Sequence, residues 1–149
     1  MGLPLTFEVE ITVQNVVASA KLGHSIDLNS VIRAYPEMEY APRNFPGLPF
    51  RLKKPKTCTL IFRSGSMICT GARSARDAER AIRKVIRKLK RRGLIIRMSR
   101  PEIVIQNIVA SGGVKGARID IERLYNLLWD KARIIYEPQD HQPCQEGLR

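Results

Sequence analysis

Two asparagines carry the most distinctive chemistry of this sequence, because both lie inside an apolar phrase that the chain repeats. Residues 13–19 read Val-Gln-Asn-Val-Val-Ala-Ser, and residues 105–111 read Ile-Gln-Asn-Ile-Val-Ala-Ser, 92 positions later. Five of the seven residues are identical, and the other two exchange Val for Ile. An amide on an apolar strand either finds a hydrogen-bond partner in a closed core or makes a specific contact to a ligand. Both interpretations stay open for Asn15 and Asn107.

The residue types that catalysis or metal binding requires form no recognisable pattern. His24 and His141 are far apart, and no nucleophile–base spacing or carboxylate pair accompanies them. The three cysteines are an odd number and show no CxxC or Cys/His ligand spacing. We therefore expect no enzyme activity, no metal and no cofactor. No signal peptide and no apolar run of membrane-spanning length appears, so we expect a reduced intracellular compartment.

The charge of the chain favours a polyanionic partner. The net charge is +12 and the isoelectric point is about 10.2, which favours DNA or RNA and, less strongly, a lipid surface. Residues 76–92 alone hold nine cations against two carboxylates, a net charge of +7. This stretch reads either as the solvated face of a helix or as a surface for a partner.

Alternating apolar residues predict the strands that would position the candidate contacts. Parity places Cys58, Leu60 and Phe62 on one strand face, with Ile68 and Thr70 beside them across a hairpin turn at 63–66. If these two sets share a face, Cys69 points the other way from Cys58, and the two cysteines cannot form a disulfide without a bulge or a slip in register. The predicted strands are 7–19, 48–53, 57–62, 67–70, 94–98 and 102–111.

Three helices are predicted from their capping signals. Asp27 precedes an apolar stripe that runs to about Tyr35, and Asp120 precedes one that runs through Leu127 or Leu128. Ser74 with Asp77 forms an S-x-x-D cap for the basic helix, which we expect to end at Arg92 before Gly93. Residues 40–47 are rich in turn formers and should form a loop.

In combination these motifs resemble the TATA-box-binding protein family, the general transcription factors of archaea and eukaryotes. The resemblance covers residues 8–138 and looks most like the archaeal branch. It rests on the repeated Gln-Asn phrase, on Tyr-x-Pro-x-x-Phe-Pro-Gly at 40–47, on Leu-Ile-Phe-x-Ser-Gly at 60–65 and on Cys-Thr-Gly-Ala-Arg at 69–73.

The resemblance implies an α+β fold in which a curved antiparallel sheet has helices on its convex face and DNA on its concave face. Residues 1–97 would form a first repeat and residues 98–138 the start of a second one, while 139–149 would be a divergent, disordered tail. The second repeat would be truncated after Tyr136-Glu137-Pro138, the counterpart of 40–42. Such a chain is a fragment, or completes its sheet with another copy of itself, or is inactive.

The resemblance also implies a role for individual residues. Phe45 and Phe62 would be wedges that enter the DNA base stack, although both could be ordinary core residues. Asn15, Asn107 and Thr70 would be polar contacts in the minor groove. Val17, Val109, Leu60 and Ile68 would be the apolar contacts around them, and Arg51, Lys56 and Ser64 would meet backbone phosphates.

The implied function is that of a general transcription initiation factor, without enzyme activity or cofactor, that binds the TATA-box minor groove and bends promoter DNA, here in truncated form. The alternative is an inactive or regulatory fragment that acts through protein pairing. The implied partners are double-stranded A·T-rich promoter DNA, transcription factor B and the RNA polymerase machinery, although the docking loop of the second repeat is missing. A homo-oligomer is possible and no membrane is involved. The implied location is the cytoplasm (the archaeal nucleoid), or the nucleus in a eukaryote.

Overall fold

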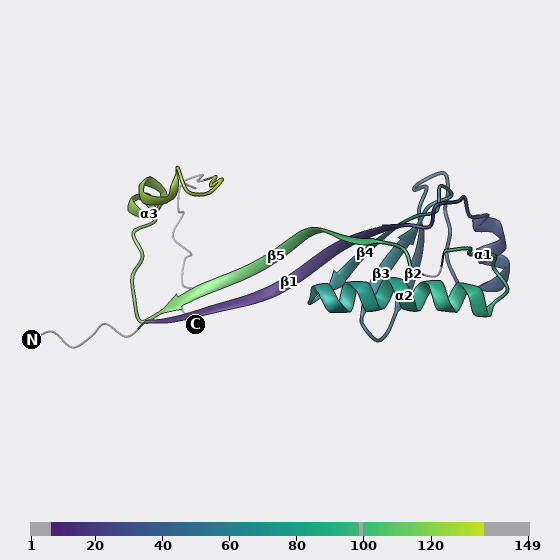
Figure 1. Cartoon of the computed structure of the whole chain (residues 1–149). Coiled ribbons are helices and arrows are strands. Elements are labelled where there is room, and N and C mark those ends of the chain that lie inside the picture. The colour runs from purple at the N-terminus through teal and green to yellow at the C-terminus, as the bar shows by residue number, and fades with distance from the viewer. Residues whose placement is uncertain (1–6, 99, 136–149) are drawn as a thin grey trace, which may run out of the picture. The chain divides into compact units, whose positions relative to one another are not determined.

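The computed structural model describes residues 7–98 and 100–135. The chain divides into a larger unit, Val9–Gly113, and a smaller unit whose described residues are 7–8 and 114–135. Residues 136–149, with the expected tail, His141 and Cys144, lie outside the described residues. The elements in chain order are β1 (Glu8–Lys21), α1 (Leu28–Ala34), β2 (Leu48–Leu52), β3 (Thr57–Ile61), β4 (Ser66–Ala72), α2 (Ala75–Arg91), β5 (Ile103–Lys115) and α3 (Ile121–Leu128) (Figure 1).

The strands form one five-stranded antiparallel sheet in the order β2-β3-β4-β1-β5. β1 pairs with β4 only from Val16 to Lys21, with a register shift between Val16 and Ala18. The preceding part of β1 runs beside β5 (Figure 1). The predicted α+β fold with a curved antiparallel sheet and helices is thus confirmed.

One face of the sheet forms the core and the other stays open. In β2, Leu48, Phe50 and Leu52 are buried, while Pro49 and Arg51 between them are half-buried and exposed. β3 and β4 alternate in the same way, as expected when a single face packs against helices. α2 covers β3 and β4 with an apolar stripe formed by Ala78, Ala81, Ile82, Val85, Ile86 and Leu89.

The capping signals place the helices as predicted. The side chain of Asp27 accepts a hydrogen bond from the Asn29 N–H at 3.0 Å, and that of Asp120 accepts one from the Arg123 N–H at 3.0 Å. Ser74 Oγ accepts one from the Asp77 N–H at 3.1 Å. These bonds satisfy N–H groups that lack a partner inside the helix. Gly93 ends α2 with a φ of +84°, a backbone conformation that favours glycine.

The predicted strand at 94–98 is wrong. This segment belongs to no strand, although Ile96 is buried in the core. The backbone N–H of Arg97 donates to His24 Nε2 at 3.3 Å, and the side chain of Met98 lies close to Gly23. At Arg97 the backbone N–H therefore bonds to a histidine side chain and not to a neighbouring strand. The apolar periodicity of the sequence does not reveal such a contact.

The prediction that Cys58 and Cys69 point to opposite faces of the sheet is confirmed. Cys58 lies opposite Thr70, and Cys69 lies opposite Thr59, so the two thiols are on different faces and both are free. Burial raises the pKa of the Cys69 thiol above its ordinary value. None of the described helices is long and apolar enough to cross a membrane.

Candidate nucleic-acid interface

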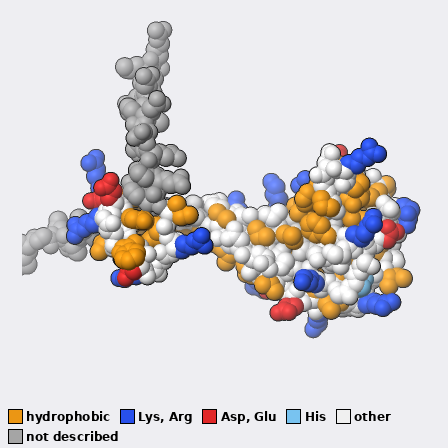
Figure 2. Space-filling view, turned by 90° about the horizontal axis from the view of Figure 1, so that it is seen from above, with side chains coloured by type: hydrophobic (Ala, Val, Ile, Leu, Met, Phe, Trp, Pro, Cys, Tyr) orange, Lys and Arg blue, Asp and Glu red, His pale blue; other side chains and the backbone are white. Residues whose placement is uncertain are grey.

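The open face of the sheet holds most of the residues predicted to make contacts. Leu60 lies directly opposite Ile68, which lies opposite Ser19 on β1. In the neighbouring row, Cys58 is flanked by Arg51 and Thr70. Val17, Leu60 and Ile68 are half-buried on this face. Figure 2 shows hydrophobic side chains on the surface of the larger unit, with Lys and Arg around them.

Asn15 and Thr70 form a hydrogen-bonded pair on this face. Asn15 Nδ2 donates to Thr70 Oγ1 at 3.1 Å, and the backbone N–H of Gly71 donates to Asn15 Oδ1 at 2.7 Å. The bond from Gly71 fixes which end of the amide is the oxygen. Nδ2 carries a second hydrogen, which suits an acceptor on a ligand. The half-buried Asn15 is therefore bonded within the sheet and also presented at its surface.

The second asparagine lies on β5. Asn107 and Val109 are both exposed. The two copies of the phrase are joined by reciprocal bonds: Gln14 Nε2 donates to Ser111 Oγ at 2.8 Å, and Gln106 Nε2 donates to Ser19 Oγ at 2.7 Å. These four residues occupy equivalent positions in the two copies, so the pairing of β1 with β5 has local twofold symmetry.

Phe45 and Phe62 form an aromatic pair at the surface. Their ring centroids are 6.1 Å apart with an angle of 64° between the planes, an edge-to-face arrangement. Phe45 is 46% exposed and Phe62 is half-buried, so neither is an ordinary core residue. The rings pack over Gly47, where a Cβ atom would lie 2.6 Å from Phe45 Cε1 and 3.0 Å from Phe62 Cε1. Only glycine leaves room for both rings.

Basic and polar groups border the face. Arg51 is exposed on β2, and Lys56 and Ser64 are exposed in the turns before and after β3. Ser66 donates its backbone N–H to Ser64 Oγ at 3.3 Å, which holds that hydroxyl at the tip of the turn. A groove of about 1070 Å³ extends from Asn15 and Thr70 past a set of cations: Arg51, Lys53, Lys54, Lys56, Arg73 and Lys84.

The sequence interpretation gave no role to two residues that position this face. Gly47 leaves space for the rings of Phe45 and Phe62. Its place in the Phe-Pro-Gly motif was the feature of the sequence that could have indicated this role. Arg73 donates from Nη1 to Gln14 Oε1 at 3.1 Å and so links the end of β4 to the repeated phrase. Arg73 closes the Cys-Thr-Gly-Ala-Arg motif, but no spacing rule could show which side chain it would meet.

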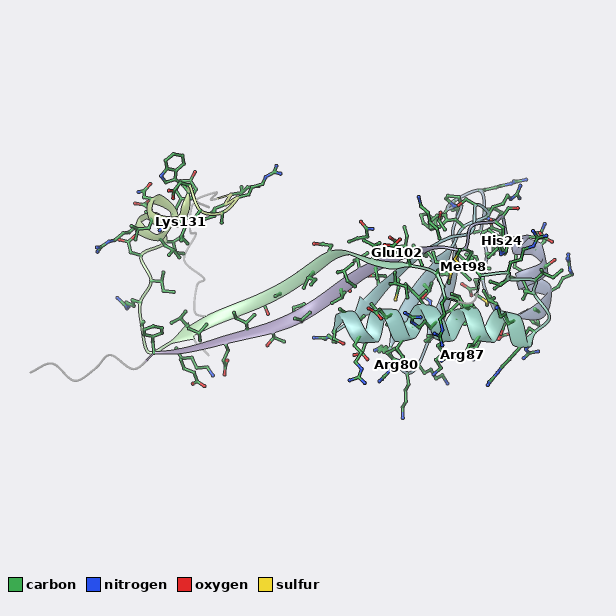
Figure 3. The ribbon with its side chains drawn as sticks, viewed as in Figure 1. His24, Arg80, Arg87, Met98, Glu102 and Lys131 are labelled. Carbon is green, nitrogen blue, oxygen red and sulfur yellow. The ribbon has the colours of Figure 1, made fainter. Side chains whose placement is uncertain are left out.

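Figure 3 shows that Arg80 and Arg87 of the basic helix point away from the sheet. Two surface ion pairs offset part of this charge: Arg80 with Asp77 at 3.6 Å and Arg83 with Glu79 at 3.8 Å. Surface pairs of this kind contribute little stability. Within residues 7–98 and 100–135, no group of three or more His, Cys, Asp or Glu side chains gathers at a potential metal site.

Comparison with known proteins confirms the resemblance of the motifs. The profile of the family described as "Transcription factor TFIID (or TATA-binding protein, TBP)" matches residues 10–92. The TATA-box-binding protein of Methanocaldococcus jannaschii is 50% identical over 104 residues, which are 70% of this chain and 56% of that protein. The one from Sulfurisphaera tokodaii is 38% identical over 141 residues, which are 95% of this chain and 66% of that protein.

A solved structure agrees. The structure named Methanococcus jannaschii TBP superposes with a TM-score of 0.61 at 50% identity and covers 68% of this chain and 57% of that chain. The match to the TATA-box-binding protein of Archaeoglobus fulgidus, 45% identical over 104 residues, likewise covers 56% of that protein. The chain therefore spans between 56% and 66% of the length of these curated relatives.

Proposed function

Because the chain belongs to the TATA-binding protein family, we propose that its open sheet face binds the minor groove of A·T-rich promoter DNA and bends it during transcription initiation. The chain would act by binding, without catalysis or a cofactor. Residues 1–97 would form the first repeat of the family fold and 98–138 the start of the second. Transcription factor B and RNA polymerase would be the protein partners, in the nucleoid of an archaeal cell.

The observation that supports this proposal best is the composition of the open face. Val17, Leu60 and Ile68 make it largely apolar, and Asn15 contributes an amide whose orientation is fixed by Gly71. The minor groove of A·T pairs presents acceptors only, whereas a G·C pair adds the guanine amino donor. A face with few hydrogen-bond acceptors fits A·T pairs, and it leaves the guanine amino group of a G·C pair without a partner.

The aromatic pair would produce the bend. Phe45 and Phe62 are accessible, lie against each other and are held in place over Gly47. Insertion of an apolar ring at a base step costs a few kcal/mol of unstacking, which the wider contact of bent DNA offsets. Arg51, Lys56 and Ser64 border the same face and would meet the phosphates.

One observation favours the alternative, in which the sheet pairs with a protein. Val9 and Ile11 of β1 and Ile108 of β5 are exposed, although they are large apolar residues on neighbouring strands. Exposed apolar strands of this kind are sites of association. Val9 and Ile11 lie outside the set of residues assigned to DNA.

Loss of the wedge tests the proposal. In a gel-shift titration with an A·T-rich duplex, Phe62→Ala should weaken binding by roughly tenfold to a hundredfold, the amount that corresponds to burial of a phenyl ring. Phe7→Ala is the matched control, since Phe7 is exposed and belongs to the smaller unit. Equal affinity of wild type and a folded Phe62→Ala variant, or no binding by the wild type, would refute the proposal.

A further inference from the structure

We propose that two copies of this chain associate through β1, with the β1 strand of each copy taking the position that β5 holds on the other. The partner is thus a second copy of the same chain, and the contact is the repeated phrase itself. This association requires no DNA and stands apart from the proposed function.

The first support is the symmetry of the phrase. In the present pairing, Gln14 bonds to Ser111 and Gln106 bonds to Ser19. Gln14 and Gln106 are equivalent in the repeat, as are Ser19 and Ser111. If the β1 strand of a second copy replaced β5, Gln14 of each copy would meet Ser19 of the other, so that the same two bonds would form with the same chemistry.

The second support is a difference in burial between equivalent positions. On β5 and just before it, Pro101 is buried and Ile103 packs against the core. Their counterparts in the first copy of the repeat are Val9 and Ile11, which are 55% and 74% exposed. An exchanged β1 would carry these two apolar side chains onto a surface that already accepts Pro101 and Ile103.

The third support is the weak anchoring of β5. Val104, Ile108 and Val109 of this strand are exposed. The unit that follows it contains no buried residue among its described positions, 7–8 and 114–135, and α3 has none. Release of β5 takes Pro101 and Ile103 off the core, but in the exchange Val9 and Ile11 of the partner copy cover the same surface, so the apolar contact that each copy loses is replaced.

The exchanged dimer would have a larger open face than one chain. Its sheet would run β2-β3-β4-β1 in one copy and continue through β1, β4, β3 and β2 of the other. The two copies would contribute two Phe45–Phe62 pairs and two Asn15 amides to one surface. The second copy would thus add a second set of these contacts to the surface.

Sedimentation velocity of the full chain without DNA, across a concentration series, tests this directly. The wild type should shift from monomer to dimer. Ile11→Lys should raise the dimer Kd roughly a hundredfold, because two buried isoleucines are lost per dimer. Since Ile11 is exposed in the monomer, circular dichroism and thermal unfolding of this variant should match the wild type.

Ile103→Lys is the matched variant at the equivalent position of β5. It weakens the contact that competes with the exchange, so the dimer Kd should fall or stay unchanged. A wild type that remains monomeric at high micromolar concentration would overturn the proposal. So would a Kd that Ile11→Lys leaves unchanged, or one that Ile103→Lys raises as much as Ile11→Lys does.

Discussion

Asn15 shows how far a single residue can be interpreted from sequence. Its place in an apolar phrase predicted either an internal partner or a ligand contact, and the structure gives it both an internal partner and a place on an open face. The choice could not be made from sequence, because Thr70 and Gly71 are more than fifty positions away. The same holds for Phe45 and Phe62, whose contact depends on the pairing of β2 with β3, in which Leu48 lies opposite Ile61.

Asn15→Asp separates the charge of this residue from its structural role. The new carboxylate can still accept from the Gly71 N–H, and the Thr70 hydroxyl can donate to its other oxygen. Thermal stability should therefore change little. Affinity for an A·T-rich duplex should fall, because a negative charge would enter a negatively charged groove. Asn29→Asp, an exposed substitution on α1 with the same charge change, is the control; equal affinities for the two variants would contradict the assignment.

Gly47 is expected to position the wedge rather than contact DNA. In Gly47→Ala the new Cβ would lie 2.6 Å from Phe45 Cε1, so the rings must move apart, at a cost of about 1–3 kcal/mol in stability. Duplex affinity should fall as well, in the direction of the Phe62→Ala variant. Gly113→Ala is the control, since no atom lies within 4 Å of its Cβ position. If both glycine variants melted and bound alike, Gly47 would have no such role.

At the scale of elements, local signals in the sequence were sufficient to predict the three helices, but they predicted one strand, at 94–98, that the structure does not contain. Each helix begins next to a residue whose side chain accepts from a backbone N–H two or three positions later, so that the signal and its partner are close in sequence. A strand requires a neighbour far along the chain. Residues 94–98 have the apolar pattern without that neighbour, and the prediction of a strand failed there for this reason.

The cap of α1 should make stability depend on pH. The hydrogen bond from Ser30 Oγ, at 2.6 Å, is the main reason that the pKa of Asp27 lies below its ordinary 3.8, with help from the Asn29 N–H and Arg33. Because this pKa is lower in the folded chain, the ionised cap stabilises above the unfolded value. That contribution is lost as the pH falls through the folded value.

Asp27→Asn retains a capping side chain but cannot ionise. The difference in urea midpoint between wild type and this variant should therefore be largest near neutral pH and should shrink as the pH falls below 3.8. Asp120→Asn, the equivalent cap of α3, controls for the general effect of removing a carboxylate. A difference that is constant from neutral to acid pH would show that the charge of Asp27 contributes nothing to the cap.

At the scale of the whole molecule, the repeat was visible in the sequence but its consequence was not. The 92-residue spacing predicted a duplicated unit. It did not predict that the two copies of the phrase would be joined by reciprocal Gln–Ser bonds. Nor did it predict that positions 9 and 11 would be exposed while 101 and 103 contact the core. Both facts depend on which strands become neighbours, and that is decided by the fold of the complete unit.

The central claim is that the open face reads the minor groove, and replacement of base pairs tests it most directly. Inosine·cytosine presents the minor-groove acceptors of A·T without the guanine amino group, while its major groove resembles that of G·C. In a binding titration, a duplex with inosine·cytosine in place of A·T should retain most of the affinity, and the same duplex with G·C should lose it. Loss of binding to the inosine duplex, equal to that with G·C, would contradict the account.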